Sequence, residues 1–478
     1  MRGAAWWRLF RWGCLAAMAL GVAVFVAYSA AAVAFPYPLD YVEGQSIYQV
    51  RLILQGVQTY QTLANDPQIL VAYPPVWPHA MAAVAWLGGL GFWTGRLLST
   101  LAVLAVAGLL GWMVAGETGD RGAGWVSGAL FLSMPYVLAT SCLARSDSWA
   151  LLMSLLGVFV VWRSRGRGPW VWLAVLFFGL AGFTRQSNLL AGPLAACGWL
   201  WLRGQRGRAL GFGLALVAAV AAAFLALNLW SDGGLFFSAF VVPADPYSPS
   251  LALSWVLRVL RTLPVFVGLA ACFFFLGLAE RKLGLAWVYL LGTGATVLLA
   301  GKFGSHVNYL MEFSAALAWV AGLLWARLRA ESADAPWVQG LLAAVLAFGV
   351  LANLSTAQGL LPRLWNYREM AAEWAQVERY MGEAEGPVLA DRAVGLLVLR
   401  GQQEIWQPFG HTSLARRGMW DQRPFVQRLE RGDFPLILMD VDIADWTWTT
   451  EMRQAIAGRY ELVDTQAGQW VYRVQAGQ

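Results

Sequence analysis

The sequence predicts a polytopic α-helical membrane protein that carries a small α/β domain at its carboxyl end. Of the 478 residues, 59% are hydrophobic and 13% are charged, whereas soluble domains average about 45–50% apolar and about 25% charged residues. Between Trp12 and Asn353 the apolar residues are grouped in runs close to the roughly 20 residues that a helix needs to cross a bilayer. This pattern excludes an ordinary soluble globular protein.

The composition changes near Leu360, where Arg, Glu, Asp and Gln return and the long apolar runs end. We therefore divide the chain into a membrane domain, residues 1–355, and a soluble domain, residues 356–478. Within the soluble domain a helical period and short apolar runs alternate, which predicts a small α/β fold. The predicted helix covers 368–381, and the predicted strands cover 387–391, 435–440, 460–463 and 470–474.

Basic residues between the apolar runs predict the topology. Arg2, Arg8 and Arg11 precede the first run, and the positive-inside rule places them in the cytoplasm. The segment 75–91 is short and proline-rich, so we interpret it as an interfacial helix rather than a crossing. The chain then crosses a cell membrane about 11 times and its carboxyl domain lies outside. The predicted spans are 12–34, 95–115, 123–142, 147–162, 170–184, 187–202, 209–229, 253–279, 284–300, 313–326 and 337–354.

The net charge of +6 does not indicate a nucleic-acid partner, because most basic residues lie in short loops between spans, as membrane topology requires. The four cysteines lie in or at the ends of apolar runs, which excludes a disulfide framework and zinc spacing. They are Cys14, Cys142, Cys197 and Cys272. The first apolar run is longer than the about 7–15 residues of a cleavable signal, so we expect it to be retained.

Two carboxylates, Asp40 and Glu43, follow the first predicted span. At a spacing of three residues, two side chains share one face of a helix. One of them can then act as a general base while the other orients it or holds a metal. The same spacing also suits two solvated acids of a loop, and the sequence leaves both interpretations open.

A second charged pair, Arg145 and Asp147, stands between two predicted spans. Charged side chains at the end of a span cost free energy unless they pair or face water, so such residues are candidates for function. The structural alternative is an ion pair that caps the following helix, with Asp147 near its amino end.

Four cations lie on the predicted outer side, against the positive-inside trend: Arg185, Lys302, Arg258 and Arg261. Arginine matches phosphate oxygens with two parallel donors, and a cationic pocket near lipid headgroups suits a phosphate-bearing lipid. Arg258 and Arg261 also fit side chains that only extend toward the headgroups, so Arg185 and Lys302 are the stronger candidates.

A polar stretch, 301–312, leads into the tenth predicted span and is typical of a site lining. Tyr73 opens the interfacial segment and belongs to the same predicted lining. The lining residues that we predict are Tyr73, His306, Asn308, Tyr309 and Glu312. No cofactor is certain; for a divalent metal, Asp147 and His306 are the candidate ligands, although a hydrogen-bonded structural histidine is the simpler interpretation. The long proline-rich loop 231–250 either closes over a site or only connects two spans.

Several of these segments together resemble the bacterial GT-C glycosyltransferases, relatives of the protein O-mannosyltransferases and of the aminoarabinose transferase that modifies lipid A. The resemblance covers the membrane part and is only general for the tail. The segments that carry it are Asp40-Tyr-Val-Glu43-Gly44, Leu54-Gln-Gly56-Val-Gln-Thr-Tyr60, Tyr73-Pro74-Pro75, Gly95-Arg96-Leu97-Leu98-Ser99, Arg145-Ser-Asp147 and Asn308-Tyr309-Leu-Met-Glu312.

The resemblance implies an inverting transferase in which an acid of the first outer loop is the catalytic base. On this chain the role falls on Asp40 or Glu43, with Asp147 as the acid of the second loop. It also implies interfacial helices after the first span and a sugar donor carried on a polyprenyl phosphate.

The predicted topology agrees, because an outward-facing site cannot draw on cytoplasmic nucleotide sugars. The acceptor is then an extracytoplasmic hydroxyl of a glycan, lipid or protein. A transporter or flippase for a lipid or sugar is the main alternative; transporters usually carry their binding groups near the bilayer midplane and often show an internal repeat. A non-catalytic protein whose tail binds cell-wall polymer is the second alternative.

Overall fold

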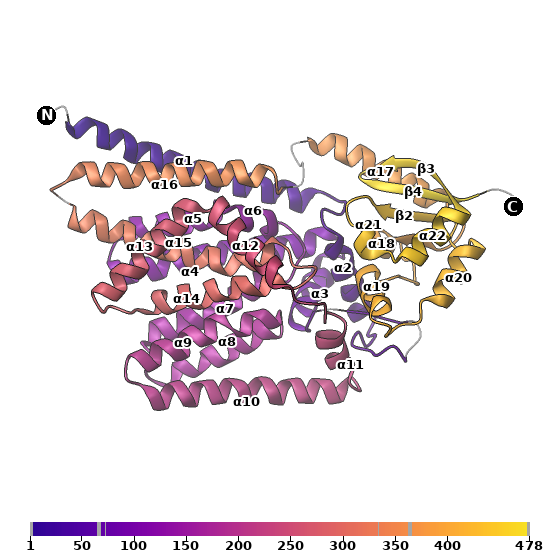
Figure 1. Cartoon of the computed structure of the whole chain (residues 1–478), viewed down its shortest axis with the longest axis horizontal. Coiled ribbons are helices and arrows are strands. Elements are labelled where there is room, and N and C mark those ends of the chain that lie inside the picture. Colours follow the sequence, from indigo (N-terminus) through magenta and orange to yellow (C-terminus); the bar gives the residue numbers. More distant parts are fainter. Residues whose placement is uncertain (1–2, 65–67, 72, 333, 362–365, 476–478) are drawn as a thin grey trace.

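The computed structural model describes residues 3–64, 68–71, 73–332, 334–361 and 366–475. Long helices form a bundle, and a small domain with a sheet packs against one end of it (Figure 1). The bundle contains α1 (Gly3–Ala34), α2 (Tyr41–Leu54), α3 (Val76–Gly88), α4 (Phe92–Thr118), α5 (Arg121–Leu132), α6 (Pro135–Ser141), α7 (Asp147–Ser164), η1 (Pro169–Trp172), α8 (Leu173–Gly182), η2 (Gln186–Leu189), α9 (Ala191–Leu202), α10 (Arg206–Trp230), α11 (Gly234–Phe236), η3 (Phe237–Val241), α12 (Pro249–Thr262), α13 (Pro264–Ala279), α14 (Leu285–Thr296), η4 (Val297–Gly301), η5 (Val307–Leu310), α15 (Met311–Glu331) and α16 (Pro336–Gln358).

The chain is a multi-pass membrane protein, as predicted. Within the described ranges, six helices are long and apolar enough to cross a membrane, and eight if each of two bent pairs counts as one span. The remaining predicted spans correspond to shorter helices: η1 with α8, α9, and α14 with η4. α3 has 13 residues, fewer than the roughly 20 of a crossing, so we still predict an interfacial helix here.

One predicted span is wrong as a straight crossing. The segment 253–279 breaks into α12 and α13, whose axes differ by 96°. Pro264 opens α13, and a proline cannot continue a preceding helix because it lacks the N–H donor and collides with the previous turn. The predicted span 123–142 is also bent, by 65° between α5 and α6, and Pro135 opens α6.

The helices differ in how much of their surface is buried. Among the apolar windows, that of α15 with η5 is 89% buried in the structure, whereas that of α10 is 11% buried. Small residues such as Ala315, Ala316 and Ala318 face neighbouring helices on α15, and small side chains let helices pack closely in membranes. α15 is therefore the central helix of the bundle, and α10 faces lipid.

The carboxyl domain has the predicted mixture of helices and strands. Its sheet has the order β1-β2-β4-β3, with β1 and β2 parallel and the other pairs antiparallel. All five residues of β2 are buried, as expected for a strand covered on both faces. The elements are α17 (Tyr367–Glu383), β1 (Val388–Ala390), α18 (Val394–Leu399), α19 (Pro408–Arg416), α20 (Arg423–Arg431), β2 (Leu436–Asp440), α21 (Ala444–Thr447), α22 (Thr450–Arg459), β3 (Tyr460–Gln466) and β4 (Gln469–Val474).

The carboxyl domain docks on the segment that follows α1. α18 crosses α2 so closely that a Cβ on Gly44 would lie 2.6 Å from the backbone nitrogen of Gly395. Arg51 of α2 donates hydrogen bonds to the carbonyls of Val398 (3.0 Å) and Gln402 (2.7 Å). The carboxyl ends of α1 and α16 both point toward the side of the bundle where the carboxyl domain covers α2 (Figure 1).

Candidate active site

The predicted carboxylates Asp40 and Glu43 form the capping box that begins α2. Asp40 is the N-cap, and its side chain accepts a hydrogen bond from the backbone N–H of Val42 at 2.9 Å. Glu43 reaches back and accepts from the backbone N–H groups of Leu39 (2.8 Å) and Asp40 (3.3 Å). Such reciprocal bonds satisfy the free N–H groups of a helix start, which explains the spacing of three residues.

Glu43 is fully buried and fully bonded. It forms a two-pronged ion pair with Arg96 of α4, at 2.8 Å from Nε and 2.7 Å from Nη2. It also accepts from the backbone N–H of Ala144 at 2.9 Å. Arg96 in turn donates to three carbonyls at the end of α1 and beyond it, those of Ala32, Phe35 and Tyr37. This closed cluster joins α1, α2 and α4 to the loop that carries Arg145.

Asp40 belongs to a second, more open cluster in which opposite charges alternate. Both its oxygens lie 3.3 Å from Nη1 of Arg145, and its side chain is 17% exposed. Nε of Arg145 lies 3.1 Å from Asp147, and Asp147 pairs with Arg185 through its other oxygen. Asn308 donates to that same oxygen at 2.7 Å. The structure thus joins five predicted residues from four parts of the chain.

The carboxylates of this open cluster keep the Arg145 guanidinium protonated. Burial by itself lowers the pKa of Arg145, but the neighbouring carboxylates of Asp40 and Asp147 outweigh it, and the net pKa lies well above the ordinary value. Arg145 therefore keeps its positive charge at any physiological pH.

A cavity of about 520 Å³ opens beside this cluster. Its cations are Arg145, Arg185 and Lys302, and the Arg185 guanidinium lies 4.2 Å from the centre of the Tyr309 ring. A cationic cavity with aromatic and amide side chains is suited to a phosphate group attached to a larger molecule. Of the predicted lining residues, Tyr73, Asn308 and Tyr309 are in its wall.

The cavity is covered by the loop that follows η3 and by the carboxyl domain. Asp245 and Tyr247 of the loop line it together with Phe409 of α19. Ser413 of α19 donates to Asp245 at 2.8 Å, and Ser248 donates its backbone N–H to the carbonyl of Gly301 at 2.8 Å. The proline-rich loop therefore closes over the cavity, and the carboxyl domain contributes to the wall. Nothing in the sequence of the carboxyl domain had indicated that Phe409 would line the cavity.

Glu312 lies deeper than the cationic cavity. It accepts from Ser154 (2.8 Å), Tyr289 (3.3 Å) and Asn188 (3.4 Å). Together with Asp147, Arg185 and other residues it lines a narrow cavity below the main one. Glu312 is thus held by neutral donors and does not meet Asp40 or Lys302 directly.

Two predicted phosphate ligands do not reach the cavity. Arg258 and Arg261 are exposed on α12, the Arg258 guanidinium lies 5.1 Å from the centre of the Trp255 ring, and neither arginine belongs to the cavity wall described here. The prediction assumed one straight span over 253–279, whereas both arginines lie on α12, which ends at a 96° bend before α13. His306 is likewise exposed beside the cavity rather than part of its wall.

The surroundings of Asp147 do not suit a divalent metal. Its oxygens already pair with two guanidinium groups and an amide, and those positive charges would repel a cation. Within the described ranges, no group of three or more His, Cys, Asp or Glu side chains is arranged to hold a metal ion.

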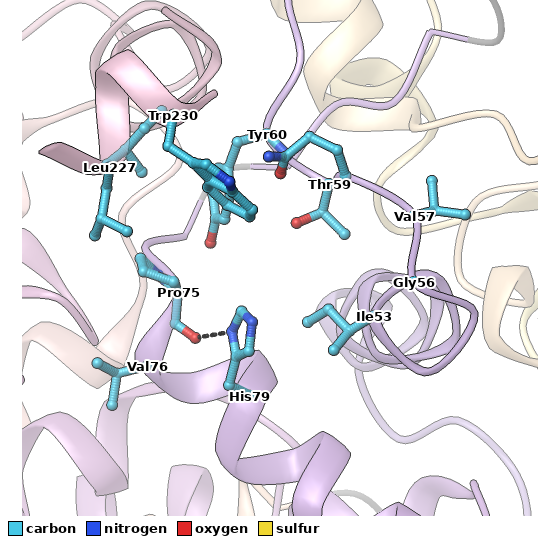
Figure 2. Close-up of a pocket in the computed structure, with 12 residues that line it drawn as sticks. Ile53, Gly56, Val57, Thr59, Tyr60, Pro75, Val76, His79, Leu227 and Trp230 are labelled. Atoms are coloured by element: carbon cyan, nitrogen blue, oxygen red, sulfur yellow. Dashed lines mark hydrogen bonds between the residues drawn. The ribbon is translucent and has the colours of Figure 1, made fainter. Parts of the chain in front are cut away.

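A second cavity, of about 580 Å³, is almost entirely apolar and lies between α2, α3 and α10 (Figure 2). Ile53, Leu227 and Trp230 point into it, and the His79 ring, bonded at 2.7 Å to the carbonyl of Pro75, faces it from α3. Tyr60 lines this cavity and donates to the carbonyl of Tyr73, whose side chain lines the cationic one. One hydrogen bond thus links a residue of each cavity wall.

No protein-family model matches the chain, and no curated protein is similar to it in sequence. Solved structures are similar in fold. ArnT from Cupriavidus metallidurans in the apo state superposes with a TM-score of 0.63 at 16% identity, over 95% of this chain and 97% of that one. The same protein bound to undecaprenyl phosphate gives a TM-score of 0.64 at 16% identity, over 96% and 98%.

The oligosaccharyltransferase of Archaeoglobus fulgidus in complex with Zn and sulfate gives a TM-score of 0.50 at 10% identity, over 97% of this chain and 73% of that one. At these identities the likeness concerns the fold, and the fold covers nearly the whole chain, including the tail for which the sequence resemblance was only general. The bundle and the carboxyl domain together have the fold of the solved ArnT structures.

Proposed function

We propose that this protein is a membrane glycosyltransferase that moves a sugar from a polyprenyl-phosphate donor to an acceptor hydroxyl, with inversion at the anomeric carbon. One observation carries the proposal: a carboxylate, Asp40, is joined through Arg145 to a cavity whose wall also holds Arg185 and Lys302. The shared fold with a protein solved in complex with undecaprenyl phosphate supports a lipid-linked donor.

In this reaction Asp40 takes the proton of the acceptor hydroxyl, whose oxygen then forms a bond to the anomeric carbon. The bond from that carbon to the phosphate oxygen breaks, and the polyprenyl phosphate leaves with the additional negative charge. Arg185 and Lys302 stabilise this charge, since cations placed where charge develops lower the barrier. Arg145 holds Asp40 in place through their ion pair.

The choice of Asp40 over Glu43 rests on access. Asp40 is 17% exposed and faces a single cation, whereas the Glu43 carboxylate is inaccessible and accepts bonds from Arg96 and three backbone N–H groups. A base must reach the proton that it removes. Glu43 is accordingly a positioning residue that holds the start of α2 and, through Ala144, the loop of Arg145.

The apolar cavity beside Tyr60 is the place that we assign to a hydrocarbon chain of a lipid substrate. It is lined by apolar side chains and borders α10, the helix most exposed to lipid. Tyr60 of this cavity bonds to Tyr73 of the cationic one, so a lipid whose chain lies in the apolar cavity would extend its phosphate toward Arg185.

We also propose that the cationic cavity and the carboxyl domain face the outside of the cell. The support is the positive-inside rule, since arginines crowd the opposite ends of α7, α9 and α10. A reporter fused after Gln478 should be active only outside the cytoplasm, and a cytoplasmic signal would contradict this orientation.

The decisive experiment is sugar transfer by the purified protein from a panel of polyprenyl-phosphate sugars, with Asp40→Asn and Glu43→Gln compared against the native chain. We expect a donor that the native protein consumes and that Asp40→Asn does not. If no donor is cleaved but intact lipid-linked sugar moves across proteoliposomes, the chain is a flippase instead.

A further inference from the structure

Six arginines gather at the ends of α7, α9 and α10 that lie opposite the cationic cavity. α7 begins at Asp147, within the open cluster, and runs for 18 residues, which is about 27 Å. The end of α10 away from this group lies beside α11 (Figure 1). We call this group the arginine cluster; it consists of Arg163, Arg165, Arg167, Arg203, Arg206 and Arg208.

No carboxylate balances the arginine cluster. The sequence contains no Asp or Glu between Asp147 and Asp232, and none of the ion pairs between described residues includes a member of the cluster. Other arginines at the same end of the bundle are paired, as Arg329 is with Asp120 at 2.8 Å.

Two adjacent cavities, one polar and one largely apolar, lie at the cluster. Arg167, Arg203 and Arg206 line a space of about 540 Å³, and Trp172 with Phe212 lines an apolar space of about 240 Å³. Arg208 belongs to the walls of both. A charged space and an apolar one that share a wall are suited to a molecule with an anionic head and a hydrocarbon tail.

The loop geometry holds this arrangement in place. Arg208 donates to the carbonyl of Gly166 at 2.7 Å. Gly166 has a φ of 66°, and a Cβ at this position would collide with Leu200 of α9. Only glycine brings the loop after α7 against α9 so closely without strain.

Tryptophans place the cluster at the depth of lipid headgroups. Trp170 and Trp201 are 73% and 45% exposed beside it, and exposed tryptophans favour the membrane interface. The guanidinium groups of Arg203 and Arg206 lie 4.8 and 5.4 Å from the ring centres of Trp199 and Trp201. These contacts fix the arginines near the surface of the bilayer.

We propose that the arginine cluster is a binding site for an anionic phospholipid, separate from the sugar-transfer site. The phosphodiester binds between Arg203 and Arg206, at the amino end of α10, where a helix also favours a negative charge. The hydrocarbon chains lie along Trp172 and Phe212. We infer a membrane lipid rather than a free anion, because a free anion has no hydrocarbon part that could fill the apolar cavity.

The test is a titration of the full-length protein, in a neutral detergent, with phosphatidylglycerol or phosphatidylcholine, with bound lipid counted by native mass spectrometry. The variant Arg203→Gln/Arg206→Gln removes the two headgroup contacts. Arg281→Gln/Lys282→Gln is the matched control, since it removes the same charge from the turn between α13 and α14 at the same end of the bundle.

We expect the native protein and the control to bind the first phosphatidylglycerol more tightly than phosphatidylcholine. The cluster variant should bind it about twenty-five-fold more weakly, because each of the two basic residues at a lipid surface contributes about a fivefold gain. Undiminished preference in the cluster variant, or an equal loss in the control, would overturn the proposal. So would competition by glycerol phosphate at the concentration at which the lipid binds, because that result would identify a site for free anions.

Discussion

Asp40 and Glu43 lie three residues apart at the start of one helix, yet their surroundings differ. Glu43 is buried, meets Arg96 through two oxygens and accepts three backbone N–H groups. Asp40 is partly exposed and shares Arg145 with Asp147. A charged group that is bonded on every side serves the fold, while one with incomplete partners beside a cavity is able to do chemistry. Spacing alone does not separate the two.

The largest effect is expected at the open cluster. Asp40→Asn should lower kcat/KM by about 10²–10⁴-fold, the usual contribution of a general base. Asparagine is as good an N-cap as aspartate, so the midpoint of thermal unfolding should stay near the native value. Initial rates of sugar transfer and an unfolding curve on the same preparation test both statements. A native rate in this variant would remove Asp40 from the mechanism.

Substitution in the closed cluster of Glu43 and Arg96 should lower the stability of the protein. Glu43→Gln leaves Arg96 buried without an opposite charge, and breaking a buried ion pair from one side costs about 3–5 kcal/mol. The loss is measurable as a lower unfolding midpoint in detergent. Glu378→Gln is the control, because Glu378 is a part-exposed acid 3.9 Å from Arg400 and such pairs contribute about 0–1 kcal/mol. Equal losses in both variants would contradict the distinction between the clusters.

Lys302 tests whether the cavity binds a phosphate. Lys302→Gln should raise KM for the lipid-linked donor by about 10- to 150-fold, since a hydrogen bond to a charged group contributes about 1.5–3 kcal/mol. Arg261→Gln is the matched control, because it removes one positive charge from a side chain outside the described cavity wall. Comparable KM changes in the two variants would mean that overall charge, not the cavity, attracts the donor.

The stability of the domain that covers the cavity should depend on pH. Burial lowers the pKa of His411 on α19 to about 4, below the ordinary value of about 6.5. The folded domain therefore binds fewer protons than the unfolded chain between these values, so the contribution to stability is complete above pH 6.5 and is lost as the pH falls toward 4. Acidification from pH 7 to pH 5 should cost about 2 kcal/mol. In His411→Gln the unfolding midpoint should change less between these two pH values.

Much of the fold follows from the sequence because hydrophobic runs and basic loops report directly on the bilayer. The prolines at 135 and 264 break two predicted crossings, and a hydropathy pattern does not tell whether the chain resumes in the same direction. Arg96 was missed as a partner of Glu43, although an arginine inside an apolar stretch was itself a signal. The wall residues Asp245 and Phe409 come from segments far apart in the chain, and their meeting depends on docking that no local pattern encodes.

The docking of α18 on α2 has a consequence for biosynthesis. Arg51 of α2 and the carbonyl of Gln402 that it binds are 351 residues apart. The ribosome has therefore made most of the protein before α18 is present to pack against α2. Domains generally fold in the order in which they emerge from the ribosome, but α2 gains its contacts with the carboxyl domain only after that domain has been synthesised. Premature termination within the last hundred or so codons should therefore leave a bundle that is inserted in the membrane but unable to work.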